Sequence, residues 1–542
     1  MTEILTAAQM RTLEKHAIES GLVSGLELME RAGRGVIAAV FRHWPDLAQA
    51  PGQAAILCGP GNNGGDGFVI ARLLRAWGWR VDLWLYGDAS KLPPDARANH
   101  DRWCAMGGAV RDYCETGPDA FALDPGAPSE RFLIVDALFG TGLTRPVSGV
   151  DAFGLATQMA GRRRMGDDGG PAARVVAVDI PSGLCADSGR YLGEGGAGRY
   201  HEAIRADLTA SFHAAKLGHY LADGPAACGA LTVVDIGLNA TEDPLVAQLV
   251  DAPDASVLEK WEGHKYGHGH ALIVSGGPRR TGAGRLAARA ALRIGAGLVT
   301  LGVPPSAQSE VAAQITALML RRVPDAEALT RLLADRRFSS VGIGPGLGLG
   351  EPEAELVEAA LRSGRACVLD ADALSVFEDR PDTLFTLTEG TQSVLTPHDG
   401  EFRRLFPDLA SRLAATPDAG PALSKVDVVR LAAERAGCAL VLPPLAYFFV
   451  FFCGLHSVRH MLKVSGVLDL DLRRSLRGMV GPTLVTFAVL AAAGLLLVRR
   501  GGAMDATLVQ VVFIGFAALT VPHMLLVDRF EARRGDARGA NG

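Results

Sequence analysis

Three aspartates in the first half of the chain each stand beside a glycine-containing segment. Asp66 lies in the run Asn62–Gly67, and Asp136 and Asp179 each end an apolar run that such a segment follows. Glycines let the backbone approach a ligand closely, and the N–H groups of a loop and of a helix start behind it point towards an anion such as phosphate. A carboxylate placed there can carry protons. Each aspartate could equally be a helix cap or a loop anchor, and the glycines a turn without a ligand.

The elements that must position these residues are short apolar runs that alternate with helical stretches. The runs predicted to be strands are 54–58, 81–86, 132–136, 175–179 and 231–235. Thr6 is predicted to cap a first helix, and residues 22–40 are predicted to form a second. Short buried strands between helices are typical of a parallel α/β sheet with Rossmann-like winding, in which ligands bind beyond the carboxyl ends of the strands.

Three blocks in this first part are specific enough to suggest a family. They are NNGGDG from Asn62, DALFGTGL from Asp136 and DIPSGL from Asp179. Together they resemble the signature blocks of NAD(P)H-hydrate epimerases. The resemblance implies a repair enzyme that acts on the hydrated nicotinamide ring of NADH or NADPH and interconverts the epimers at the hydroxylated carbon.

The same resemblance implies roles for individual residues. Asn63, Asp136 and Ser182 would hold K+, through hard oxygen ligands that suit such a cation. Asp179 would be the acid–base group, because epimerising a hydroxyl-bearing carbon requires the loss and return of a group. Lys216 could be a solvated surface lysine or a structural or ligand contact. The residues implied to bind the substrate's phosphates and ring are Asn62, Asn63, Gly64, Gly65, Asp66, Gly140, Thr141, Gly142, Leu143, Thr144, Arg145, Pro146 and Asp179.

A second series of blocks extends to residue 441. A glycine-rich strand end at 344–348, two aspartates at 370 and 372, and TPHDGE at 396–401 occur in that order. They resemble the ADP- or ATP-dependent NAD(P)H-hydrate dehydratases, whose fold is ribokinase-like α/β. Such enzymes phosphorylate the ring hydroxyl and eliminate phosphate, which regenerates NAD(P)H. By this resemblance the residues that contact the hydrated dinucleotide would be Ala283, Gly346 and His398.

The dehydratase pattern stops near residue 442. The family would continue with a nucleotide turn and a GTGD-type loop, whose backbone holds the phosphates and whose aspartate activates the hydroxyl. Here Leu442 is followed by Pro443-Pro444-Leu445, and GTGD occurs nowhere in the printed sequence. Because phosphoryl transfer depends on positioning and charge stabilisation, we expect no dehydratase activity. We also expect this incomplete domain to expose core surface.

Residues 442–542 are membrane-like in composition. Uncharged runs at 440–455, 480–498 and 506–527 approach the length that a bilayer requires, so anchoring by residues 442–527 is predicted. The surroundings of three histidines resemble bacteriorhodopsin-related β-carotene dioxygenases, which hold non-haem iron. This implies Fe2+ ligation by His456, His460 and His523. That family's earlier spans and remaining histidine ligands have no counterpart here, so oxygenase activity is not expected.

The composition limits the expected cellular location and binding partners of the protein. A net charge of −5 provides no basic footprint for nucleic acid. Eight cysteines without a CxxC pair suggest neither a zinc site nor a disulfide framework. Since the N-terminus also lacks an apolar signal core, we expect cytoplasmic catalytic domains. The expected partner is a small molecule, hydrated NAD(P)H, and a homo-oligomer is expected.

The predicted organisation is therefore an epimerase domain (1–245), a linker (246–261), an incomplete dehydratase domain (262–441) and a helical membrane-like tail (442–542). The predicted function is metabolite repair by epimerisation of hydrated NADH and NADPH. Two alternatives stay open. One is a membrane-tethered pseudoenzyme that only binds nucleotide, and the other is an iron-dependent β-carotene dioxygenase fragment that carries an N-terminal passenger.

Overall fold

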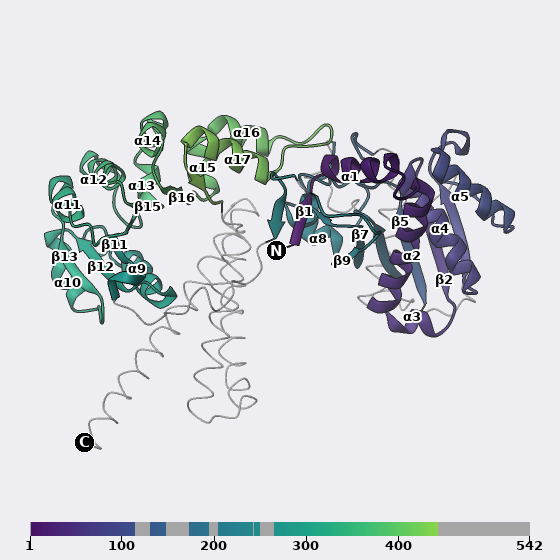
Figure 1. Cartoon of the computed structure of the whole chain (residues 1–542), viewed down its shortest axis with the longest axis horizontal. Coiled ribbons are helices and arrows are strands. Elements are labelled where there is room, and N and C mark those ends of the chain that lie inside the picture. Colours follow the sequence, from purple (N-terminus) through teal and green to yellow (C-terminus); the bar gives the residue numbers. More distant parts are fainter. Residues whose placement is uncertain are drawn as a thin grey trace, which may run out of the picture. The chain divides into compact units, whose positions relative to one another are not determined.

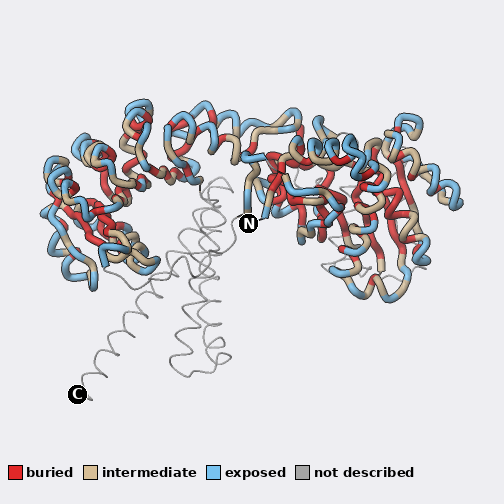
Figure 2. The backbone as a smooth tube through the Cα atoms, in the orientation of Figure 1, coloured by how far each residue is buried: buried red, intermediate tan, exposed pale blue. Residues whose placement is uncertain are grey.

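The computed structural model describes residues 2–113, 131–147, 173–193, 204–241, 243–249 and 265–442. Within these ranges the chain forms two seven-stranded sheets and one three-stranded sheet (Figure 1). Buried residues are concentrated in the strands of both large sheets (Figure 2). No helix in these ranges is long and apolar enough to cross a bilayer. The predicted membrane-like tail lies outside the described residues from Pro443 onwards.

The first large sheet has the strand order β4-β3-β2-β5-β6-β7-β9, and all its strand pairs are parallel. Its strands are β2 (Gln53–Cys58), β3 (Arg80–Leu85), β4 (Arg111–Asp112), β5 (Phe132–Ala137), β6 (Ala173–Val178), β7 (Leu208–Phe212) and β9 (Ala230–Val234). The helices of this part are α1 (Ala7–Glu19), α2 (Gly25–His43), α3 (Pro45–Gln49), α4 (Asn62–Ala76), η1 (Ala89–Lys91), α5 (Pro94–Ala105), α7 (Leu217–Tyr220) and α8 (Gly224–Cys228). The predicted parallel α/β sheet is confirmed.

Strand β7 is not predicted from the sequence because Thr209 and Ser211 interrupt its apolar character. Both side chains are buried in the structure. The Thr209 hydroxyl donates a hydrogen bond to the carbonyl of Cys228 at 2.7 Å, and the Ser211 hydroxyl donates to the carbonyl of Ala214 at 3.0 Å. A buried hydroxyl that is hydrogen-bonded avoids the penalty of an unpaired one, so this strand can lie inside the sheet.

Helix α4 begins at Asn62, shortly after β2 ends at Cys58, so residues 62–66 form its first turns and not a loop. Its N-cap residue is Gly61, with no side-chain cap. Gly67 lets this helix lie close to the sheet, since a Cβ there would be 2.7 Å from Cys58 Sγ and 2.9 Å from the Cβ of Ala137. The N-terminus of a 15-residue helix therefore lies at the carboxyl edge of the sheet, where N–H groups favour an anion.

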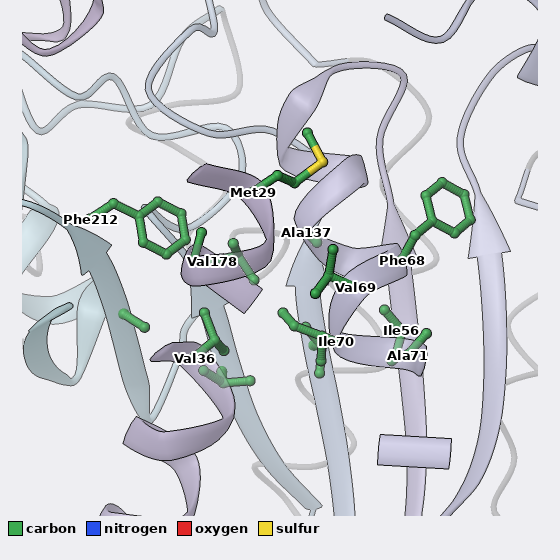
Figure 3. Packing of buried hydrophobic residues seen from close by; sticks show 14 of the residues in the cluster. Met29, Val36, Ile56, Phe68, Val69, Ile70, Ala71, Ala137, Val178 and Phe212 are labelled. Carbon is green, nitrogen blue, oxygen red and sulfur yellow. The ribbon is translucent and has the colours of Figure 1, made fainter. Parts of the chain in front are cut away.

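The largest apolar cluster lies between this sheet and helices α2 and α4. Figure 3 shows Val36 of α2 and Ile70 of α4 among the side chains that gather over Ile56 and Val178 of the strands. These four residues are at most 1% exposed. Their burial fixes α4 against β2 and β5, and with it the segment that carries Asn63.

A small sheet brings distant parts of the chain together, in the order β10-β1-β8. Its strands are β1 (Thr2–Leu5), β8 (Ala215–Lys216) and β10 (Ala247–Leu249). The predicted linker at 246–261 therefore begins with a strand that pairs with β1, and most of the rest of it lies outside the described residues. Thr6 is confirmed as the N-cap of α1, since its hydroxyl accepts a hydrogen bond from Gln9 N–H at 3.2 Å.

The second large sheet is also parallel throughout, in the order β13-β12-β11-β14-β15-β16-β17. Its strands are β11 (His270–Val274), β12 (Leu298–Val303), β13 (Met319–Arg322), β14 (Ser340–Ile343), β15 (Ala366–Leu369), β16 (Ser393–Leu395) and β17 (Ala439–Leu440). The helices of this part are η4 (Lys265–His268), α9 (Gly282–Ile294), η5 (Pro305–Ala307), α10 (Gln308–Ala312), α11 (Ala326–Leu333), α12 (Glu351–Arg362), α13 (Asp372–Ser375), α14 (Pro381–Thr388), α15 (Asp399–Leu405), α16 (Pro407–Ala414) and α17 (Lys425–Ala436).

One face of the second sheet carries exposed apolar side chains. The register aligns five residues across β11, β14, β15, β16 and β17, namely Ile273, Gly342, Val368, Val394 and Ala439. Ile273 is buried against the cluster that includes α9, whereas Val368 is 45% exposed although β15 has a strand on either side. Val368 thus lies on a central strand of a parallel sheet, where side chains are normally covered. That this domain is incomplete stays a prediction.

Candidate active site

The predicted site residues meet around the segment 138–141, which follows β5. Its first half contacts Asp136, at the end of β5, and Ser182, which follows β6; both are predicted to ligate K+. Leu138 N–H donates a hydrogen bond to Oδ1 of Asp136 at 3.3 Å. Phe139 N–H donates to Ser182 Oγ at 2.8 Å. The segment therefore ties together the carboxyl ends of these neighbouring strands.

The second half of the segment contacts the other two predicted residues. Gly140 lies against Asn63, whose Oδ1 would be only 2.9 Å from a Cβ at Gly140. Thr141 N–H donates a long hydrogen bond, 3.4 Å, to Oδ2 of Asp179. Asn63, from the start of α4, and Asp179, which follows β6, thus contact adjacent residues of this segment.

Asp136 and Ser182 are also joined directly. The Ser182 hydroxyl donates to Oδ1 of Asp136 at 2.6 Å, and Ser182 N–H donates to Oδ2 at 2.8 Å. Both side chains are buried, and burial raises the pKa of Asp136 to about 6 even though Ser182 and Leu138 N–H oppose the shift. No cationic side chain of the described residues forms an ion pair with Asp136. A buried carboxylate in this state fits a small cation as counter-charge.

Asn63, whose side chain lies against Gly140, carries an unsatisfied polar group. Its Nδ2 is buried and has no hydrogen-bond partner among the described residues. The amide oxygen of Asn63, the carboxylate of Asp136 and the hydroxyl of Ser182 are hard oxygen donors, the type of ligand that suits an alkali cation. That they hold K+ stays a prediction. The described residues contain no group of three His, Cys, Asp or Glu side chains that could hold a metal ion.

Asp179 is held by a lysine. Lys216 Nζ lies 2.8 Å from Oδ1 of Asp179, and it also donates to Ser211 Oγ and to the carbonyl of Phe212, each at 2.9 Å. Lys216 is 0% exposed, which excludes the surface-lysine alternative. Burial alone would raise the pKa of Asp179, but the Lys216 ammonium outweighs it and holds this pKa below its usual range.

Two further carboxyl groups are affected by the charge of Asp179. Burial, together with the carboxylates of Asp179 and Glu14, raises the pKa of Asp66 well above its usual range. Burial and Asp179 likewise raise the pKa of Glu14 to about 7, against the opposing effect of Lys216 and Arg11. Glu14 was not predicted as a site residue, because on α1 it cannot be told from the solvated polar residues of an amphipathic helix.

The other predicted substrate-binding residues differ in exposure. Gly64 and Gly65 are buried, and close packing already explains these glycines: a Cβ would lie 2.0 Å from the carbonyl oxygen of Gly59 or 2.5 Å from Met29 Sδ, respectively. Asn62 is exposed. In the segment after Thr141, Leu143 is partly buried, and the exposed residues are Gly142, Thr144, Arg145 and Pro146.

The second sheet brings its predicted residues to one edge without direct contacts between them. Gly346 follows β14 at φ +72°, and a Cβ there would be 2.5 Å from the carbonyl oxygen of Arg280, close to Ala283 in the chain. His398 follows β16 and caps α15, with Nε2 3.0 Å from Oε1 of Glu401. Since these segments follow strands of one parallel sheet, they share its carboxyl edge.

Each of the two parts of the chain matches a known protein family. Residues 25–218 match the family described as YjeF-related protein N-terminus, and residues 271–442 match NAD(P)H-hydrate dehydratase. An NAD(P)H-hydrate epimerase of Rhodobacter capsulatus is 53% identical over 193 residues, which cover 35% of this chain and 80% of the relative. A second such epimerase, from Roseobacter litoralis, is 46% identical over 246 residues, covering 44% of this chain and 100% of the relative.

The bifunctional NAD(P)H-hydrate repair enzyme Nnr of Salinibacter ruber is 35% identical over 428 residues, which cover 74% of this chain and 75% of the relative. The chain belongs to this bifunctional repair family. Both resemblances, to the epimerases and to the dehydratases, are therefore confirmed.

The end of this repair-family chain matches a different family. Residues 427–531 match Beta-carotene 15,15'-dioxygenase, so the resemblance noted for the tail is confirmed as well. This match overlaps the end of the dehydratase match at residues 427–442, which contain most of α17 and all of β17. His456, His460 and His523 lie outside the described residues, and their iron site stays a prediction.

Proposed function

We propose that the first part of the chain interconverts the epimers of hydrated NADH and hydrated NADPH. The observation that supports this most directly is the segment 138–141, which contacts Asp136, Ser182, Asn63 and Asp179 in turn. Family membership supplies the substrate class, since the epimerase relatives match this part.

In this proposal the substrate's phosphates lie at the N-terminus of α4 and its ring lies towards Asp179. The helix start favours an anion through its N–H groups and its dipole. The exposed Arg145 adds a charge suited to phosphate. Asn63, Asp136 and Ser182 would hold K+, which would supply positive charge next to the bound dinucleotide.

Epimerisation requires that the ring hydroxyl leave and that a hydroxyl return to the opposite face. An acid gives a proton to the departing hydroxyl, so that water leaves, and a base takes a proton from the water that returns. One proton is given and one is taken back, so the enzyme ends the cycle with the number of protons it began with. Asp179, held ionised by Lys216, is suited to be the base. Asp66 and Glu14, whose pKa values are raised, are suited to hold the proton that is given.

The test is epimer exchange by the full chain. One purified epimer of hydrated NADH is incubated with the protein, and the appearance of the other is followed chromatographically against the spontaneous rate. We expect exchange that rises in proportion to protein concentration and needs K+. Exchange at the spontaneous rate would refute the proposed function.

For the second part we propose binding of the hydrated dinucleotide without dehydration. The chain lacks the GTGD-type loop, and the face beside Val368 is exposed. Supplying ADP or ATP should therefore not restore the absorbance of reduced nicotinamide, whereas a complete dehydratase added to the same mixture should. Nucleotide-dependent recovery by the chain alone would contradict this. Membrane anchoring by residues 442–527 and homo-oligomer formation stay predictions.

A further inference from the structure

We propose that Lys216 is a positioning residue for epimerisation, which occupies Oδ1 of Asp179 and leaves Oδ2 as the oxygen that exchanges protons with the substrate. This inference rests on the proposed function, because it assumes that Asp179 is the base. It goes beyond that function by naming the reactive atom and the group that orients it.

The ammonium group of Lys216 has three N–H donors, and the described residues supply three acceptors. These are Oδ1 of Asp179 at 2.8 Å, Ser211 Oγ at 2.9 Å and the carbonyl oxygen of Phe212 at 2.9 Å. A fully buried ammonium is tolerated only when it is paired and hydrogen-bonded in this way. Lys216 therefore has no donor left for a substrate, which makes a direct role in binding unsuitable for it.

A second connection holds the backbone of Asp179. Lys216 N–H donates to Nδ1 of His219 at 3.0 Å, so the other ring nitrogen carries the proton. That nitrogen, Nε2, lies 2.9 Å from the carbonyl oxygen of Asp179 and donates to it. Burial and the Lys216 charge lower the pKa of His219 to about 4, so the ring stays neutral and keeps this arrangement at neutral pH.

These contacts hold Asp179 in a backbone conformation that it would otherwise seldom adopt. Its φ is +68°, in the left-handed region that is uncommon for residues other than glycine. Asp179 N–H also donates to the carbonyl of Ala210 at 2.8 Å. With main chain and Oδ1 both held, the carboxylate has one orientation.

Oδ2 is the oxygen that remains available. Among the described residues its contact is the Thr141 N–H at 3.4 Å, a long and weak hydrogen bond. Thr141 belongs to the segment predicted to bind the substrate, next to Gly140 and Asn63. Oδ2 thus faces the segment where the ring is proposed to lie, while Oδ1 faces the buried lysine.

The other titratable groups around Asp179 determine what losing Lys216 would do. They are Asp66 of α4, Glu14 of α1 and the neutral His219 of α7. Without the ammonium, Asp179 would lose the buried cation beside it, and Arg11, which acts on Glu14, would be the remaining cation of this group among the described residues. Asp179 would then bind a proton at higher pH than in the wild-type protein, and less of it would be in the basic form near neutrality.

The test compares Lys216→Met with Lys216→Gln in the full chain. Both remove the charge, and Gln retains a polar donor towards Asp179. For each we expect kcat for epimer exchange at neutral pH to fall by about 10²-fold or more, with KM changed far less. The acid limb of the pH–rate profile should move to higher pH, which partly restores the rate in alkaline buffer.

The matched control is Lys15→Met, the same substitution at an exposed lysine on α1 whose partner is Glu19. It should retain the wild-type rate and profile. Folded Lys216 variants with wild-type kcat and an unmoved acid limb would overturn the inference. So would failure of both variants to fold, because Lys216 would then be only structural. A wild-type chain without exchange would refute the proposed function instead.

Discussion

The Ser182 hydroxyl lies 2.6 Å from Oδ1 of Asp136, and the two residues come from the ends of neighbouring parallel strands. The pair is buried, so neither side chain is arranged for contact with bulk water. Because Ser182 Oγ also accepts from Phe139 N–H, the hydroxyl is held in place from two sides. A carboxylate that is fixed this firmly, with no cationic partner among the described residues, would suit the small cation proposed for this site.

Asp136→Asn should therefore raise the K+ concentration that epimer exchange requires. It should also cost some stability, because both oxygens of the buried carboxylate accept hydrogen bonds from Ser182 or Leu138. The substitution removes the buried negative charge that attracts K+. The K+ concentration for half-maximal exchange should therefore rise by about tenfold or more, which corresponds to a loss of about 1.4 kcal/mol in binding free energy. Titration of epimer exchange with KCl at constant ionic strength measures this. Asp101→Asn, at a largely exposed aspartate, is the control. An unchanged K+ titration in Asp136→Asn would remove Asp136 from the cation site.

Gly140→Ala should act on the same site through Asn63. The new Cβ would lie 2.9 Å from Asn63 Oδ1, closer than real contacts allow, so the amide must move. We expect a higher K+ requirement. Gly267→Ala is the control, because a Cβ there also meets no atom within 4 Å and should leave the K+ requirement as in the wild type. Equal K+ titrations for both variants would show that Asn63 does not ligate the cation.

The sequence predicts the strand ends of this site better than it predicts what surrounds them. Asp136 and Asp179 are recognisable because each ends an apolar run. Once the sheet is known to be parallel, the ends of such runs are known to lie at its carboxyl edge. The burial of Lys216 has no local signal. It depends on the pairing of Leu5 with Lys216 across the small sheet, a contact between residues about two hundred positions apart. The position of Glu14 near the site could not be predicted for the same reason. Helix periodicity shows which face of α1 carries Glu14, but it does not show which distant residues lie against that face.

Stability should depend on pH through Glu14. Its pKa is raised to about 7 in the folded chain from an ordinary value of 4.5, so the folded state holds a proton that the unfolded state loses first. Stability should therefore fall as pH rises from about 4.5 to 7, by roughly 1–3 kcal/mol for this group.

Glu14→Gln cannot lose a proton and should lack that part of the decline, which makes it more stable than the wild type above pH 7 and similar below pH 4.5. Urea unfolding across this pH range measures the difference. Glu19→Gln, at an exposed glutamate of the same helix, should follow the wild type. Parallel curves for Glu14→Gln and the wild type would mean that Glu14 is solvated in the folded chain.

Asp179→Asn should destabilise the fold as well as abolish exchange, because it leaves the ammonium of Lys216 buried without a counter-charge. Removing one partner of a buried ion pair costs about 3–5 kcal/mol. Adding Lys216→Met removes the stranded charge, so the double variant should regain most of this loss while remaining inactive. Urea unfolding of the single and double variants gives the coupling free energy. Strict additivity of the two substitutions would show that Asp179 and Lys216 do not stabilise each other, and the 2.8 Å contact would then have no energetic meaning.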